Sequence, residues 1–236
     1  MKRNRRHGLL GSMSDQISGT VEIVMALADD AAVEPSALVD LISTWVGAVE
    51  LGLFGPGRLR LQGALETQSQ RVRVTIECEH VPQAAFRGLS RMVQHFSKVR
   101  GRVESFELLY EGGQRLVADG AMMIPGLPQT PPFTLELPTD LHAAVRVEIE
   151  FRSPLAQSQR DAVFDALAIW DRLVEVLGDE EQWGERVDRD TRLLSPRLVE
   201  HEVIGYFASF ECLHFVVLLG LRLHQRLSIE RITIES

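Results

Sequence analysis

The chain has 236 residues, and its 45% hydrophobic and 25% charged residues exclude the compositions of disordered, collagenous and disulfide-rich proteins. Its 33 acidic residues outnumber the 25 Lys and Arg residues, which argues against nucleic-acid binding and suits a basic protein partner. The chain has two lone cysteines, Cys78 and Cys212, which favour a reducing compartment over a disulfide framework. Its apolar runs are far shorter than the ~20 residues of a membrane span, so we expect a cytoplasmic protein.

A basic segment, residues 1–13, opens the chain, and we expect it to be a disordered tail or a cloning remnant. The first predicted domain, 14–111, follows it. Apolar residues at every second position predict strands there, and apolar residues at every third or fourth position predict helices. The predicted elements of this domain are a strand over 21–27, a helix over 35–55, a hairpin over 59–79, a helix from Pro82 and a strand over 103–110.

A motif of the first helix recurs about 125 residues later in the chain. With identical spacing, Asp40, Trp45, Val49 and Glu50 correspond to Asp165, Trp170, Val174 and Glu175. The apolar stripe of the second helix also recurs, since Phe86, Leu89, Met92 and Phe96 correspond to Leu213, Val216, Leu219 and Leu223. This pattern predicts a tandem duplication of a ferredoxin-like (βαββαβ) unit, an α+β fold with two antiparallel sheets that each carry two helices on one face.

The second predicted domain, 144–236, departs from the first in one place. Residues 179–192 are charged and show no apolar alternation, so we expect a loop there, with at most a short strand near Leu193 and Leu194. Between the two domains, 112–143 is rich in Pro and Gly and predicts an extended connector that lies along a domain surface.

Charged residues alternate with apolar ones over 71–79 and 145–152, which predicts outward sheet faces with cross-strand ion pairs. The helix over 210–225 is apolar on all sides and must be buried on more than one of them. We therefore expect the helix layers to meet, either within the chain or across a homodimer. Residues that could form this interface are Phe215, Val217, Leu218 and Leu221.

The strongest functional candidate is the acidic loop around Trp183. An aromatic ring supplies contact area and the surrounding carboxylates steer a basic partner. The predicted partner-binding residues are Trp183, Asp179, Glu180, Glu181, Glu185, Asp188 and Asp190. We expect a non-enzymatic protein-binding module, for example an inhibitor or immunity-type protein that neutralises a basic target, with no cofactor, metal or catalytic residue.

Two other function classes remain open from the sequence. A small-molecule binder or enzyme would have its site in the cleft between the two halves. That site would be lined by Asp40, Trp45, Asp165 and Trp170, or formed by Cys78 and His80 if strand alternation puts both on the inward face. The other class is a structural subunit of a larger assembly, which would use the apolar helix at 212–221.

Overall fold

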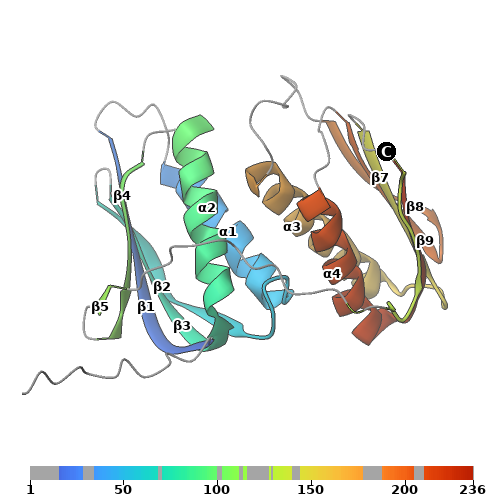
Figure 1. The fold of residues 1–236 in the computed structure, drawn as a ribbon, viewed down its shortest axis with the longest axis horizontal. Coiled ribbons are helices and arrows are strands. Elements are labelled where there is room, and N and C mark those ends of the chain that lie inside the picture. Colours follow the sequence, from blue (N-terminus) through green and yellow to red (C-terminus); the bar gives the residue numbers. More distant parts are fainter. Residues whose placement is uncertain are drawn as a thin grey trace, which may run out of the picture.

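The computed structural model describes residues 16–28, 35–68, 71–99, 103–111, 114–115, 128, 130–139, 144–177, 188–204 and 210–235. Its described part is an α+β structure with two mainly antiparallel sheets and four helices. The helices lie between the two sheets, so the order of layers is sheet, helices, helices, sheet (Figure 1). None of the described helices combines the length and the apolar character that crossing a lipid bilayer requires.

The first sheet has the strand order β2-β3-β1-β4-β5 and carries α1 and α2 on its inner face (Figure 1). Strand β1 shows why the sheet forms, because Val21, Ile23 and Met25 are fully buried while the residues between them are only partly buried. The elements of this half are β1 Gln16–Leu27, α1 Pro35–Glu50, β2 Arg58–Gln68, β3 Arg71–Pro82, α2 Gln83–Val99, β4 Val103–Tyr110 and β5 Gln114–Arg115.

The second sheet has the order β6-β10-β7-β9-β8, in which β6 runs parallel to β10 and the other neighbours are antiparallel. Leaving out the short strands β5 and β6, both halves therefore share the element order β-α-β-β-α-β and the same strand order. The elements of this half are β6 Thr134–Glu136, β7 Ala144–Phe151, α3 Gln157–Leu177, β8 Asp188–Ser195, β9 Leu198–Ile204, α4 Phe210–Leu227 and β10 Ile229–Glu235.

The helix layers meet within the chain, where α3 packs against both α1 and α2. The ring of Phe54, in the turn after α1, meets the ring of Phe215 on α4 edge to face, with the ring centroids 5.9 Å apart. A Cβ atom on Gly47 would lie 2.8 Å from Ile169 Cδ1, so glycine allows α1 and α3 to approach closely. The Arg222 guanidinium of α4 donates to the Gly52 carbonyl oxygen over 3.4 Å, which adds a polar contact between the halves.

The four predicted interface residues lie inside this helix layer. Phe215, Val217 and Leu218 are buried in the single chain, and Leu221 is partly buried against the same core. The matched stripes of α2 and α4 are buried too, as their apolar spacing predicts. The apolar helix α4 is therefore covered on both sides by its own chain.

The structure corrects the expected loop at 179–192. Strand β8 begins at Asp188 and pairs with β9 as far as Ser195, so the strand is longer than the short one expected near Leu193 and Leu194. Its inward positions include the polar residues Arg189 and Thr191. Arg189 pairs with buried Asp171, and Thr191 contacts His201. The strand therefore lacks the alternating apolar residues from which a strand is predicted. Residues 179–187 lie outside the described part.

The connector carries two short strands in its described part. At its start, β5 pairs with the end of β4, and near its end β6 adds a parallel strand beside β10. Phe133, next to β6, is buried and its ring lies 5.8 Å from that of His224. Both ends of the connector thus lie against sheet edges. Strands of two and three residues are too short to show a pattern in the sequence, because they form only when the neighbouring sheet is in place.

Candidate functional site

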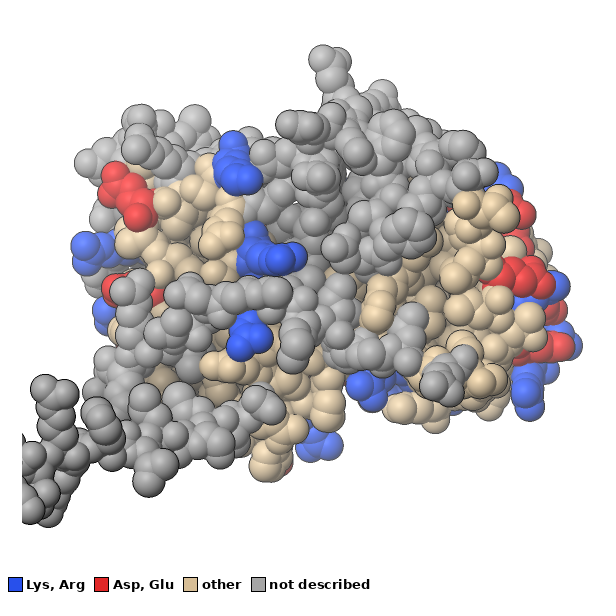
Figure 2. Space-filling model, viewed as in Figure 1, with Lys and Arg blue, Asp and Glu red and all other residues tan. Residues whose placement is uncertain are grey.

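The outer face of the second sheet carries a dense set of charged side chains, as the sequence predicts for 145–152, and we name this set the acidic face. Carboxylates and guanidinium groups alternate along its visible edge (Figure 2). The carboxylates outnumber the guanidinium groups, even when the exposed Arg152 just beyond β7 is included. The acidic face consists of Glu136, Glu148, Glu150, Asp190, Glu200, Glu202, Glu230 and Glu235, together with Arg146, Arg192, Arg197 and Arg231.

Arg146 of β7 is the centre of one ion-pair group on the acidic face. Its Nη2 lies 3.1 Å from Glu202 Oε1, its Nη1 3.4 Å from Glu235 Oε2, and its Nε 3.6 Å from Glu200 Oε2. The hydrogen bond to Glu202, followed by the negative charges of Glu200 and Glu202, raises the pKa of Arg146. Arg192 of β8 holds the other oxygen of Glu200, whose side chain is only 5% exposed. Glu200 is therefore fixed between two guanidinium groups.

A second ion-pair group lies at the other end of the acidic face. Arg197 Nη2 lies 3.2 Å from Glu150 Oε1 and 3.1 Å from Glu230 Oε2. Arg231 also binds Glu150, over 3.0 Å, and reaches Glu136 at 3.8 Å. Because each guanidinium group contacts at least two carboxylates, the positive charges on this face are already engaged.

Glu148, in the middle of β7, differs from the other carboxylates on this face. It is half-buried and lies opposite Glu200 of β9 and Thr233 of β10 in the strand register. No ion pair or hydrogen bond joins its side chain to another described residue. Like charges directly opposite each other on a sheet are destabilising. A cationic side chain from another molecule would relieve this arrangement, which makes Glu148 the centre of the candidate site.

A polar cluster lies on the inner side of the same strands. His201 of β9 is buried, its Nδ1 lies 2.7 Å from Thr191 Oγ1, and its ring meets the Trp170 ring at a centroid distance of 5.7 Å. Burial, and then the positive charge of Arg189, lowers the pKa of His201 to about 4, although Asp190 acts in the opposite direction. The imidazole is therefore neutral near pH 7. It is enclosed by the core, and it packs the sheet against α3.

The predicted partner-binding residues lie only partly within the described structure. Trp183, Asp179, Glu180, Glu181 and Glu185 are outside the described residues. Asp188 begins β8, but its side chain is not among those described. Asp190 is exposed on the acidic face, 3.5 Å from Arg192. The end of the predicted acidic segment thus joins the acidic face through β8.

Cys78 and His80 do not share the inward face, so this expectation is wrong. Cys78 is buried, and burial, followed by the charge of Glu77, raises the pKa of its thiol to about 12. His80 is exposed and has a φ of 53°, and its N–H donates to Ser18 Oγ over 2.9 Å. The pairing of β1 with β3 shifts between Ile17 and Gly19, which interrupts the alternation of faces. A thiolate with a histidine base is not formed here.

The residues proposed to line a cleft between the halves do not form one. Trp45 is fully buried, its Nε1 donates to the Ala85 carbonyl over 2.7 Å, and its ring packs on Phe86. Trp170 is buried in the other half, while Asp40 and Asp165 are exposed on their helices. Within the described ranges, no group of His, Cys, Asp and Glu side chains has an arrangement that could hold a metal ion.

Sequence reasoning identified the charged row on β7 but not the special position of Glu148. That position depends on the β7–β9 register, which places Glu148 opposite Glu200. The register between strands about fifty residues apart cannot be predicted from either strand alone. The alternating Glu residues of β9 are the signal that could have pointed to it.

No protein-family model matches the chain, and no curated protein matches it. Among solved structures, a de novo designed protein, Ferredog-Diesel, is 17% identical with a TM-score of 0.26 over 48% of this chain and 98% of its own. A protein of Galdieria sulphuraria described as unknown is 10% identical with a TM-score of 0.22 over 93% of this chain and 98% of its own. The ferredoxin protease FusC, solved with Arabidopsis ferredoxin, is 11% identical with a TM-score of 0.21 over 89% of this chain and 34% of its own. Similarities at these TM-scores assign neither a family nor an activity.

Proposed function

We propose that the protein is a non-enzymatic module that binds a basic protein through the acidic face, as an inhibitor or immunity-type protein would bind its target. The observation that carries this proposal is Glu148, a half-buried carboxylate opposite Glu200 that lacks a cationic partner among the described residues. A Lys or Arg side chain of the partner would supply the missing charge. The carboxylate excess around it would steer a basic protein toward this face.

The shape and rigidity of the acidic face favour a protein over a small molecule. Small-molecule sites are concave and mostly apolar, whereas this site is the outer surface of a sheet covered with charged groups. Arg146 and Arg192 hold Glu200 in place before a partner arrives, which lowers the entropy lost on binding. In this proposal Trp183 and the acidic residues that precede β8 extend the contact surface.

We further infer that the chain is a tandem duplication of a ferredoxin-like unit. The same strand order in both halves supports this inference, as do the recurring Asp and Trp positions of α1 and α3. The binding role does not depend on it, because unrelated functions occur on the same fold.

Replacing Glu148 by glutamine is expected to raise stability while abolishing partner binding. The substitution removes the repulsion from Glu200, so the free energy of unfolding should rise by about 0.2–1 kcal/mol. The same change removes the carboxylate that would meet the partner's cation. Chemical denaturation measures the first effect, and affinity capture from the source organism's lysate at low and high salt measures the second.

Glu107→Gln is the matched control for this experiment. Glu107 is an exposed carboxylate on the first sheet, opposite Val24, so its removal relieves no repulsion. We expect the wild type and Glu107→Gln to retain the same basic protein at low salt, and Glu148→Gln to lose it. If Glu148→Gln retained that protein as well as the wild type does, the proposed function would be wrong.

A further inference from the structure

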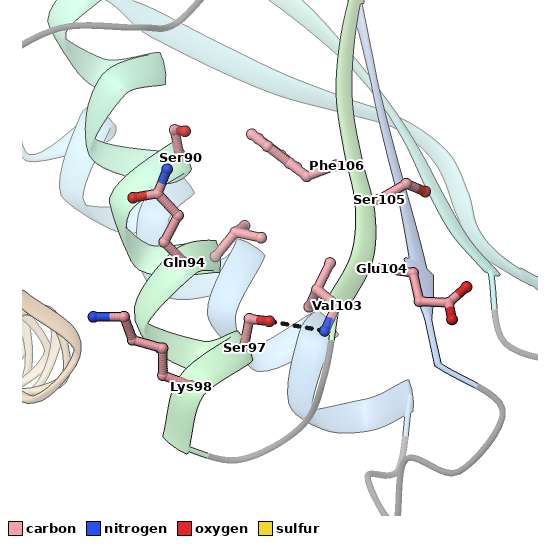
Figure 3. A pocket seen from close by; sticks show the side chains of 9 residues that line it. Ser90, Gln94, Ser97, Lys98, Val103, Glu104, Ser105 and Phe106 are labelled. Atoms are coloured by element: carbon pink, nitrogen blue, oxygen red, sulfur yellow. Dashed lines mark hydrogen bonds between the residues drawn. The ribbon is translucent and has the colours of Figure 1, made fainter.

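A hollow of about 460 Å³ lies between α2 and β4, on the half of the molecule opposite the acidic face (Figure 3). Its base is apolar, formed by Val93, Val103 and Phe106. The polar lining comes from Ser90, Gln94, Ser97 and Lys98 of α2 and from Glu104 and Ser105 of β4 (Figure 3). The hollow therefore combines an apolar floor with polar and charged groups, and its positive charge lies on the helix side.

The strand that borders this hollow has an unpaired side in the described structure. Strand β4 pairs with β1 along one side over Val103–Tyr110. On its other side, among described residues, only Leu109 and Tyr110 pair, with β5. The Val103 N–H donates to Ser97 Oγ over 3.0 Å, so it is not available to a partner strand. The backbone N–H and C=O groups of 104–107 on the unpaired side can accept an added strand. A groove between a strand edge and a helix is a geometry in which proteins bind extended peptides.

The charge of α2 indicates which peptide would fit. The helix contains Arg87, Arg91 and Lys98 and has no Asp or Glu between Gln83 and Val99. Lys and Arg side chains lie in a row over the region of α2 (Figure 2). Arg91 is exposed and makes no ion pair with a described residue. This helix is thus a positively charged wall in a chain whose net charge is -8.

We propose that the groove between α2 and β4 binds an extended acidic peptide, which adds to the edge of β4 as a strand. Side chains on one face of the peptide would contact Val103 and Phe106 on the apolar floor. Acidic side chains near α2 would lie beside Arg91. This site takes a ligand of the opposite charge to the partner of the acidic face, and it does not depend on that partner.

The test uses the full chain and a fluorescent peptide that alternates Glu and Val. Binding is measured by anisotropy. Hydrogen exchange is measured with and without peptide at the amides of 104–107 that do not pair with β1. The Glu-Val peptide should bind and slow exchange at these amides, while a Lys-Val peptide should not. Gln94→Glu adds a carboxylate to the helix wall and should weaken binding roughly fivefold or more. The matched change Gln225→Glu, at an exposed position of α4, should leave binding unchanged.

Three results would overturn the proposal. Equal binding to the wild type and Gln94→Glu would place the peptide elsewhere. Binding without slowed exchange at the amides of 104–107 that do not pair with β1 would exclude strand addition. Slow exchange in the free protein at the amides of 104–107 that do not pair with β1 would mean that another part of this chain already occupies the edge.

Discussion

Replacing either Phe54 or Phe215 by alanine is expected to cost about 3–5 kcal/mol of unfolding free energy. Both rings are buried, at 2% and 1% exposure, and they meet edge to face between the two halves of the molecule. Each substitution leaves a cavity in the helix layer where the two halves meet. Chemical denaturation followed by circular dichroism measures the loss.

A double-mutant cycle tests whether the two rings act together. The double variant should lose less stability than the two single losses added, by about 0.5–1.5 kcal/mol, since the aromatic pair is lost only once. The control is a second cycle that combines Phe54→Ala with Phe151→Ala. Phe151 is fully buried at the end of β7, and the two losses should be nearly additive. If alanine variants do not fold, the leucine variants repeat the cycle with smaller losses. Additivity of the Phe54 and Phe215 losses would contradict a direct contact between the halves.

Acidification is expected to destabilise the protein through His201. In the unfolded chain this imidazole has a pKa near 6.5, and in the folded chain its pKa is about 4. The folded state therefore binds fewer protons between these values. The contribution of neutral His201 to the free energy of unfolding is therefore complete above pH 6.5 and is lost as the pH falls to 4. The shift corresponds to about 3 kcal/mol at 1.36 kcal/mol for each pH unit.

His201→Asn should remove this loss, because an amide does not titrate and can still reach Thr191. The measurement is the free energy of unfolding at several pH values between 4 and 7. His80→Asn is the control, since His80 is exposed and asparagine tolerates its positive φ. This control should keep the wild-type pH dependence. An unchanged slope in His201→Asn would show that another group causes the acid loss.

Local patterns in the sequence were sufficient for most of the helices and strands. The alternation in β1, β3 and β7 and the apolar stripes of α2 and α4 each arise within one element, and the structure buries the residues that these patterns mark. Strand β8 could not be found in this way, because its inward residues Arg189 and Thr191 are satisfied by polar partners on α3 and β9. Those partners are known only once the elements are assembled.

The candidate site was less accessible from the sequence than the fold. The charged character of the β7 row could be predicted, since it needs only alternation along one strand. The lack of a partner for Glu148 within the described part of the chain could not, because it follows from the register with β9 and β10. The error on His80 has a similar origin, since a shift in the pairing of β3 with β1 turned the side chain outward.

The two faces of β9 also bear on how the chain folds. Val199 and His201 are buried on the inner face, while Glu200 and Glu202 bind Arg146 on the outer face. If β9 slipped by one residue during folding, both carboxylates would enter the core without a cation and the apolar residues would face water. Misaligned intermediates are thus strongly disfavoured relative to the native alignment. The ion pairs that shape the acidic face thereby also select the correct strand alignment.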